Sequence, residues 1–294
     1  MKLRRTKIAV IAATAALVLA ACGNAGDEDS NPVENKVDED AASQFDDGTA
    51  MKELADAGKI KIGVKFDQPG IGFKKAGADV PTGFDIEMGK ILAAKLGIKA
   101  SDVDWVETIS DNREPFLQKG TVDLVIASYS ITDERRQVVG QAGPYYVTGQ
   151  QLLVKKGSDI KSVDDLKGKE VCSVTGSTSL DNVEAKGAKP RGFETYSECR
   201  DQVQNGSVEA MTTDGSILLG YVAENPDELE VVGEPFSEER YGIGYSKDKP
   251  ELCKFITDTV TKAEEDGDWK KAFEATLGKS GVETPEPPKM DACA

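Results

Sequence analysis

The sequence predicts an α/β protein of two lobes joined by two extended crossings. Short β-type runs alternate with helical patterns through residues 59–277, which is typical of mostly parallel sheets covered by helices. One extended run, at 145–154, separates two sets of such units, and a second, at 241–245, returns the chain to the first set. A single continuous sheet is the alternative that this pattern leaves open.

Lobe 1 is expected to comprise residues 51–149 and 246–294. The run Lys59–Lys65 alternates apolar and polar residues as a strand does, and Phe84–Leu96 carries apolar residues at helical spacing. The other expected elements of this lobe are strands at 104–107 and 122–127 and helices at 112–119, 132–139, 251–263 and 269–277.

Lobe 2 is expected to comprise residues 150–245. Its elements are predicted as strands at 170–174, 191–196 and 208–212, followed in turn by helices from 177, at 198–205 and at 214–222. Three prolines after residue 284 indicate an irregular C-terminal tail, which a disulfide at Cys293 would hold in place.

The N-terminus has the pattern of a bacterial lipoprotein signal. Four basic residues precede Ile8–Ala21, an apolar run of 14 residues, which is shorter than the roughly 20 residues of a membrane span. It ends in Leu-Ala-Ala-Cys, the lipobox pattern, in which the cysteine is lipidated. We therefore expect removal of residues 1–21 and attachment of the protein to the outer face of the cytoplasmic membrane by lipid on Cys22. An ordinary secretory signal is the alternative.

Residues 22–50 are expected to form a flexible acidic tether. Between Gly23 and Ala50 there are nine acidic residues and one lysine, with few aliphatic side chains. Such a segment buries too little apolar surface to fold by itself. The net charge of the whole chain is −16, which disfavours nucleic acid as a partner because phosphate contacts need a basic surface.

The chain contains no histidine. This excludes Ser-His-Asp and Cys-His catalysis and histidine-containing metal sites. No pair of cysteines has C-x-x-C spacing, so we expect no catalytic residue, no metal and no cofactor.

Four cysteines remain after Cys22, in a compartment that permits disulfides. Three pairings are open. We favour Cys172–Cys199 and Cys253–Cys293, because each pair lies within one predicted lobe. Free buried thiols are the alternative.

Four stretches of sequence carry a resemblance to a known family. They are Gly83–Ile86 (GFDI), Val122–Val125 continuing through Ser128–Arg135 and Gly143–Tyr146, Val174–Thr178 (VTGST), and Asn205–Ala210 leading to Asp214. The chain resembles the polar amino-acid branch (family 3) of the extracytoplasmic solute-binding proteins of ABC importers, over roughly residues 58 to 276. The resemblance implies a periplasmic-binding-protein-like fold, an amino-acid ligand, an ABC permease as partner and a monomer.

An amino-acid ligand presents a carboxylate and an ammonium group. Arg135 is the candidate for the carboxylate, because a guanidinium can donate two parallel hydrogen bonds. The loop of Ser128 and Ser130, just before it, can share the same carboxylate. Ser177 and Thr178 begin a helix whose free N–H groups attract an anion, with plain helix capping as the alternative.

One further group, Asp214, completes the expected site. The resemblance implies that Asp214 takes the ligand ammonium, although an aspartate at this point is otherwise an ordinary helix cap. Arg136, the neighbour of Arg135, is expected to be solvated.

The run Thr108–Arg113, which includes Ser110, is similar to the glutamate/aspartate-type members of the family. Lys65 and Arg113 would together suit a second carboxylate, and hence glutamate or aspartate. Gln68 and Phe66 are weaker candidates. If Lys65 and Arg113 pair with acids of the protein instead, glutamine, asparagine or another polar amino acid becomes the expected ligand.

Two other functions stay open. The protein could hand its ligand to a membrane receptor as an amino-acid-sensing lipoprotein, which the sequence does not separate from transport. Periplasmic dehydratases that resemble this family use carboxylates of the pocket as acid and base, but no separate motif here suggests that role.

Overall fold

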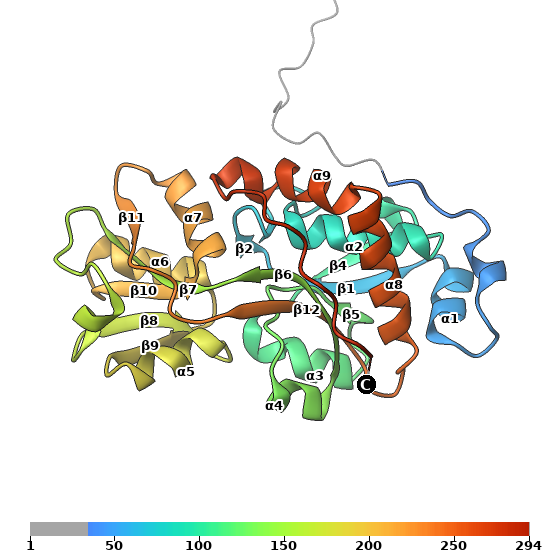
Figure 1. Cartoon of the computed structure of the whole chain (residues 1–294), viewed down its shortest axis with the longest axis horizontal. Coiled ribbons are helices and arrows are strands. Elements are labelled where there is room, and N and C mark those ends of the chain that lie inside the picture. The colour runs from blue at the N-terminus through green and yellow to red at the C-terminus, as the bar shows by residue number, and fades with distance from the viewer. Residues whose placement is uncertain (1–34, 294) are drawn as a thin grey trace, which may run out of the picture. The chain divides into compact units, whose positions relative to one another are not determined.

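A computed structural model describes residues 35–293 and contains two five-stranded sheets (Figure 1). The strand order is β4-β1-β5-β12-β6 in one sheet and β11-β7-β10-β8-β9 in the other. We call the halves built on these sheets lobe 1 and lobe 2. The two-lobe α/β prediction is confirmed, and the single continuous sheet is wrong. The expected signal sequence, Cys22 and the first part of the expected tether lie outside the described residues.

In lobe 1 the two strands that flank β1 run parallel to it, and β12 runs antiparallel to its neighbours. The strands of this sheet are β1 (Ile60–Val64), β4 (Val103–Glu107), β5 (Leu124–Val125), β6 (Gly140–Thr148) and β12 (Glu239–Tyr245). A small hairpin, β2 (Asp67–Gln68) and β3 (Gly72–Phe73), follows β1.

The helices of lobe 1 are α1 (Ala50–Ala57), α2 (Phe84–Lys95), α3 (Arg113–Gln118), α4 (Asp133–Val138), α8 (Leu252–Glu265) and α9 (Asp268–Ala275). Figure 1 shows α2 and α9 on one side of the strands and α3 and α4 on the other. All but α1 were expected from the sequence, within a few residues at their ends.

In lobe 2 the strands β10, β8 and β9 run parallel to one another, and β7 runs antiparallel to β10 and β11. The elements are β7 (Gln150–Lys155), β8 (Glu170–Val174), α5 (Thr178–Ala185), β9 (Lys189–Phe193), α6 (Tyr196–Asn205), β10 (Ala210–Asp214), α7 (Gly215–Glu224) and β11 (Leu229–Val232). The edge strand β11 was not expected, because its apolar run is only a few residues long.

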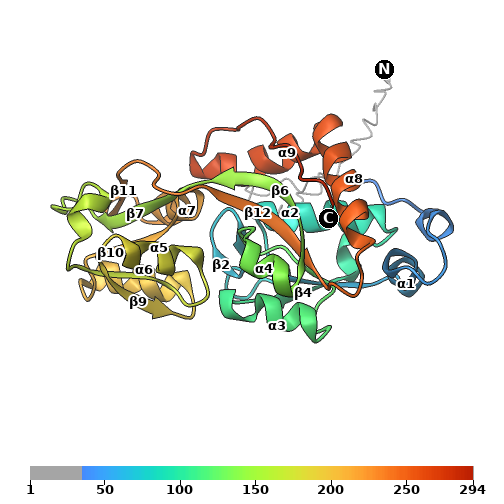
Figure 2. The ribbon, with the colours of Figure 1, turned by 60° about the horizontal axis from the view of Figure 1, so that its bottom comes forward.

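The two crossings between the lobes touch each other (Figure 2). The chain leaves lobe 1 at Gly149, between β6 and β7, and a Cβ there would lie 2.7 Å from the Cβ of Pro235 on the returning segment. The return therefore lies between β11 and β12. The prediction that the crossing runs at 241–245 is wrong, because Tyr241–Tyr245 pairs within the sheet of lobe 1. Lobe 2 accordingly ends before Glu239 rather than at residue 245.

An aromatic cluster links the crossings to the core of lobe 1. Tyr145 of β6 and Tyr241 of β12 lie 6.1 Å apart between ring centroids. Phe84 at the start of α2 contacts Tyr145 and also Trp269 of α9, whose indole N–H donates to the Tyr145 carbonyl. The crossing strands are thus held by large buried rings.

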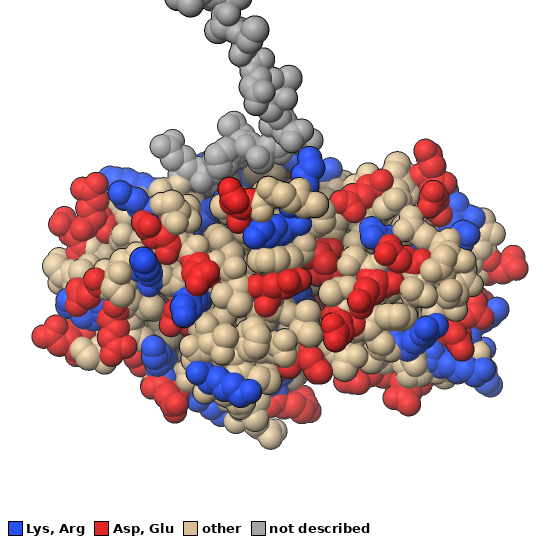
Figure 3. Space-filling model, turned by 180° about the vertical axis from the view of Figure 1, so that it is seen from behind, with Lys and Arg blue, Asp and Glu red and all other residues tan. Residues whose placement is uncertain are grey.

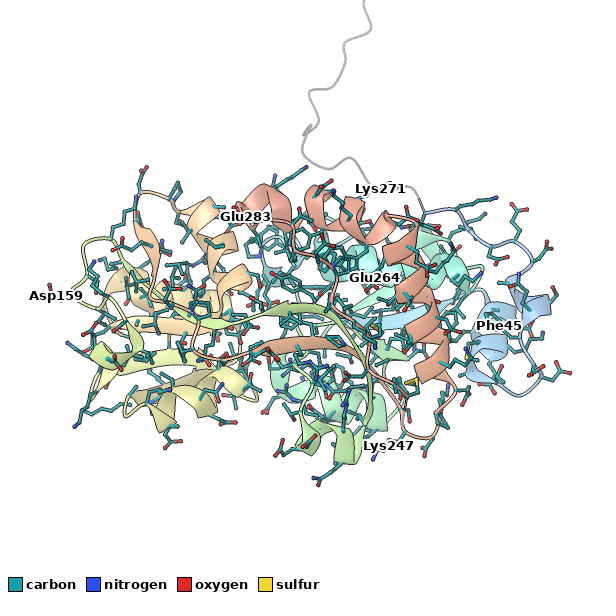
Figure 4. All side chains as sticks on the ribbon, in the orientation of Figure 1. Phe45, Asp159, Lys247, Glu264, Lys271 and Glu283 are labelled. Atoms are coloured by element: carbon teal, nitrogen blue, oxygen red, sulfur yellow. A yellow bond between two sulfur atoms is a disulfide. The ribbon has the colours of Figure 1, made fainter. Side chains whose placement is uncertain are left out.

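Residues 38–50 are packed rather than free. The N–H of Asp38 donates to the carbonyl of Ala94 in α2, Ala41 is buried, and the ring of Phe45 makes an edge contact with Phe255 of α8. Figure 4 shows Phe45 beside α1 and α8. The flexible tether predicted through residue 50 is therefore wrong for this stretch, since a few apolar side chains suffice when they pack on a lobe that is already folded.

Both favoured disulfides, Cys172–Cys199 and Cys253–Cys293, are present. The second holds the C-terminal tail against α8. Two residues before Cys293, the Asp291 carboxylate forms ion pairs with Arg136 (2.8 Å) and Arg240 (2.6 Å). Arg136 was expected to be solvated. Its side chain is 36% exposed and also forms this ion pair.

The described surface carries charges of both signs. Figure 3 shows acidic and basic side chains interspersed on the face opposite to that of Figure 1. Within residues 35–293, no helix has the length and apolar character needed to cross a membrane.

Replacing Cys253 and Cys293 with serine should lower the free energy of unfolding by about 2–4 kcal/mol, because the bond closes a long loop. The two residues are 40 positions apart. Urea denaturation measures the change. Asp291→Asn is the control, since it keeps the disulfide and removes exposed ion pairs that contribute about 1 kcal/mol or less. An unchanged denaturation midpoint in the double serine variant would contradict this role of the tail.

Candidate ligand-binding site

The expected site residues follow the carboxyl ends of parallel strands. Lys65 follows β1, Ser110 and Arg113 follow β4, and Ser128 follows β5 in lobe 1. In lobe 2, Ser177 follows β8 and Asp214 ends β10. Loops at the carboxyl ends of parallel strands are where α/β proteins place their ligands, and the two sheets present these ends to each other.

One cavity between the lobes brings most of these residues together. It is lined by Arg113, Ser128, Ser130 and Arg135 of lobe 1 and by Ser177, Thr178, Ser179, Tyr196 and Asp214 of lobe 2. The expected residues Lys65 and Ser110 do not line it, nor do the weaker candidates Phe66 and Gln68. Ser110 is joined to the lining through Arg113, whose Nε donates to its carbonyl, and it accepts from Lys65 through its hydroxyl. The volume open to the centre of a water-sized sphere is about 10 Å³, which is room for about one water molecule.

Two guanidinium groups of lobe 1 converge on a single carbonyl oxygen of lobe 2. Arg113 Nη2 donates to the Gly176 carbonyl at 3.0 Å, and Arg135 Nη2 donates to the same oxygen at 2.9 Å. A Cβ on Gly176, which has φ of +77°, would lie 2.8 Å from Asp111 Oδ1 and 3.0 Å from Asp111 Cα. Glycine is therefore required for this contact between the lobes.

The remaining donors of the two guanidiniums are held by lobe 1. Arg135 donates to the Ser130 carbonyl at 2.7 Å and pairs with Glu114 at 3.2 Å. Arg113 donates through Nε to the Ser110 carbonyl at 3.0 Å. Both guanidinium carbons lie over the ring of Tyr129, at 4.5 and 5.1 Å from its centroid. Like charges are thus tolerated side by side because an aromatic face and a carboxylate adjoin them.

Lys65 is buried beside this pair. Its ammonium donates to the Ser110 hydroxyl at 2.8 Å. Burial, followed by the nearby charge of Arg113, lowers the pKa of Lys65 to about 7. Among the described residues, no acidic side chain forms an ion pair with Lys65 or Arg113. The charges of Asp67 and Asp85 lie near enough to raise the pKa of Lys65, but neither acid pairs with it directly.

The lobe 2 hydroxyls already have partners. Ser177 accepts the Leu180 N–H as the cap of α5 and donates to the Val174 carbonyl. Thr178 donates to Glu239 Oε2 at 2.9 Å. The Ser177 hydroxyl is thus a helix cap, as the alternative predicted. The Thr178 hydroxyl is hydrogen-bonded to Glu239, an acid that was not among the predicted site residues.

Asp214 does not cap α7 with its side chain. Its Oδ2 accepts the hydroxyl of Tyr241, and its buried Oδ1 has no hydrogen-bond partner among the described residues. Burial, followed by the neighbouring Glu239, raises the pKa of Asp214 to about 7. A buried acceptor without a partner is costly, so this oxygen is suited to accept from a ligand.

Tyr196 and Glu239 are the main residues that sequence reasoning missed. Tyr196 opens α6, and the signal was available, since Thr195 and Glu198 form a capping box just after β9. Glu239 is buried at the start of β12, and nothing in its surrounding residues marked it. Within residues 35–293, no cluster of acids and cysteines is suited to hold a metal ion.

Comparisons with known proteins agree with this geometry. Residues 60–279 match the family described as bacterial extracellular solute-binding proteins, family 3. The ABC transporter glutamine-binding protein GlnH of Bacillus subtilis is 35% identical, with 94% of this chain and 98% of that protein covered. The glutamate-binding protein GluB of Corynebacterium efficiens is 35% identical, over 81% of this chain and 85% of that protein.

A solved structure described as an ancestral arginine-binding protein bound to glutamine has the same fold. It superposes with a TM-score of 0.70 at 39% identity and covers 75% of this chain and 98% of that one. Residues 60–279, which match the family, contain both sheets and every residue of the cavity. The chain belongs to the bacterial extracellular solute-binding proteins of family 3.

Proposed function

We propose that this protein binds a polar amino acid, glutamate or aspartate, outside the cell and delivers it to the permease of an ABC importer. The observation that carries the proposal is the convergence of Arg113 and Arg135 on one oxygen, the Gly176 carbonyl. Donors that converge on one oxygen suit a carboxylate. On the lobe 2 side, the unpartnered Oδ1 of Asp214 suits an ammonium group.

Ligand entry requires the lobes to separate. The cavity has room for about one water molecule, far less than an amino acid needs. On separation, Arg113 and Arg135 lose the Gly176 carbonyl and become available to a carboxylate. The ligand then favours a closed state because it contacts both lobes at once. In this proposal Arg135, Ser128 and Ser130 load the ligand, while lobe 2 completes its hydrogen bonds.

The choice of ligand side chain rests on Lys65 and Arg113. Lys65, with Ser110 beside it, lacks an acidic partner among the described residues, which supports a second ligand carboxylate. One observation favours glutamine instead: the donors of Arg113 are occupied by main-chain carbonyls of Ser110, Ala127 and Gly176. Relatives named for both ligands are similar to this chain, so glutamine binding is the second candidate.

The proposal includes a lipid anchor on the membrane. The lipobox pattern supports lipidation of Cys22 and a position on the outer face of the cytoplasmic membrane. A receptor could take the place of the permease without any change in the site. The proposal assigns no catalytic role to the carboxylates of the cavity.

A thermal-shift panel of the twenty amino acids tests the proposal. Glutamate or aspartate should raise the unfolding midpoint most, because a ligand at a hundredfold excess over its Kd stabilises the folded state by about 2.7 kcal/mol. Arg135→Lys should weaken binding of that ligand by about 10- to 100-fold, since a single ammonium group cannot donate the two parallel hydrogen bonds of a guanidinium. The greatest shift with glutamine would select the second candidate, and no shift with any amino acid would overturn both.

Glutamate binding should depend on pH through Lys65. At about pH 7 roughly half of the Lys65 side chains are uncharged, and a ligand carboxylate beside Lys65 raises its pKa, so binding takes up protons. Glutamate affinity should therefore fall by up to about tenfold per pH unit as pH rises above 7. Titration of Asp214 and of the ligand ammonium changes the affinity for glutamate and the affinity for glutamine in the same way.

Calorimetry with both ligands at several pH values measures this effect, and glutamine serves as the internal reference. Lys65→Met should abolish the difference in pH dependence between the two ligands. If glutamate and glutamine keep the same pH dependence in the unaltered protein, Lys65 does not face the ligand side chain.

A further inference from the structure

Asp85 is a fully buried carboxylate that does not line the cavity. Its two oxygens accept hydrogen bonds from groups that are distant in sequence. Oδ2 accepts the N–H of Ser128 at 2.8 Å, and Oδ1 accepts the hydroxyl of Tyr145 at 2.6 Å. Burying a carboxylate is costly unless it is well hydrogen-bonded. These two bonds and the nearby charge of Lys65 favour the ionised form of Asp85.

The position of Asp85 at the start of α2 favours a buried negative charge. The dipole of a helix places partial positive charge at its first turn, which favours an anion there. The backbone there is fixed, because the Asp85 N–H donates to the Ile71 carbonyl and a Cβ on Gly83 would lie 2.2 Å from the same oxygen. Asp85 is thus a rigid point from which its carboxylate reaches the loop after β5.

Ser128 is held in an unfavourable conformation at that point. Among the described residues it is the one non-glycine residue with positive φ, at 43°. Such a conformation is strained in a residue other than glycine and needs support from its surroundings. The turn brings two successive carbonyls, of Ala127 and Ser128, to 3.3 and 3.4 Å from Arg113 Nη1. The conformation of Ser128 therefore contributes to the orientation of the Arg113 guanidinium, together with the Ser110 and Gly176 carbonyls.

We propose that Asp85 is a positioning residue for ligand binding: by accepting the Ser128 N–H it holds the loop that orients Arg113. Through Tyr145 it also ties this loop to β6, the strand that leads to lobe 2. The inference rests on the proposed function, because it concerns how the same site is built. It assigns Asp85 no contact with the ligand.

Substitution of Ser128 distinguishes a positioning role of Asp85 from a role in packing alone. Asp85→Ala removes both acceptors and should weaken binding of L-glutamate and L-glutamine by about tenfold or more, the cost of an unsupported buried donor and a strained turn. Glycine adopts positive φ without strain. In a Ser128→Gly background the strain is absent but the buried N–H at 128 still loses its acceptor, so Asp85→Ala should cost clearly less than it does with serine at 128.

Two matched variants complete the design. Asp85→Asn keeps an acceptor for the Ser128 N–H and a donor for the Tyr145 oxygen, and should restore affinity to within about threefold of the unaltered protein. Tyr145→Phe removes the other hydrogen bond of the same carboxylate. It should lower the urea midpoint while leaving affinity within about threefold, because the Ser128 N–H keeps its partner.

The proposal is overturned if Asp85→Ala binds as well as the unaltered protein, or if its loss is equally large with Gly at 128. If the unaltered protein binds neither ligand, the proposed function fails instead. Should Asp85→Ala not fold, hydrogen exchange of the Ser128 amide in the unaltered protein decides. Slow exchange supports the Asp85 bond, and exchange at the rate of a free loop amide contradicts it.

Discussion

One oxygen atom of lobe 2 holds both cations of the candidate site. The Gly176 carbonyl accepts hydrogen bonds from both Arg113 and Arg135, so two cations of lobe 1 are joined to the start of α5 in lobe 2. The glycine is required there because any side chain would meet Asp111. In the proposed complex a ligand carboxylate takes these donors. A carbonyl carries only a partial charge, so a carboxylate is the stronger acceptor for two guanidiniums.

Each of the two strands that lead to the crossings supplies a tyrosine hydroxyl that donates to a buried acid. Tyr145 of β6 donates its hydroxyl to Asp85, and Tyr241 of β12 donates to Asp214. The two rings also contact each other within the aromatic cluster of lobe 1. One carboxylate supports the Ser128 loop, and the other presents a free oxygen to the cavity. The core and the site are therefore built from the same side chains.

Much of the fold could be predicted because apolar periodicity and strand-helix alternation are local. β1, α2 and β8 lie where the pattern indicated, and Arg113, Arg135 and Asp214 meet in one cavity. The errors have a common cause, since they concern contacts between distant segments. Residues 38–50 look solvated in isolation yet pack on α2 and α8. Tyr241–Tyr245 looks like a crossing until its pairing with β5 and β6 is known. Glu239 can be recognised as a site residue only once the fold places it beside Thr178 and Asp214.

A crystal structure of the protein with L-glutamate tests the central claim most directly. The account predicts that a ligand carboxylate lies within hydrogen-bond distance of the Arg135 guanidinium and that the ammonium lies on Asp214 Oδ1. It also predicts that the Gly176 carbonyl no longer accepts from both Arg113 and Arg135. Glutamate bound elsewhere, with both of these hydrogen bonds to Gly176 retained, would contradict the account.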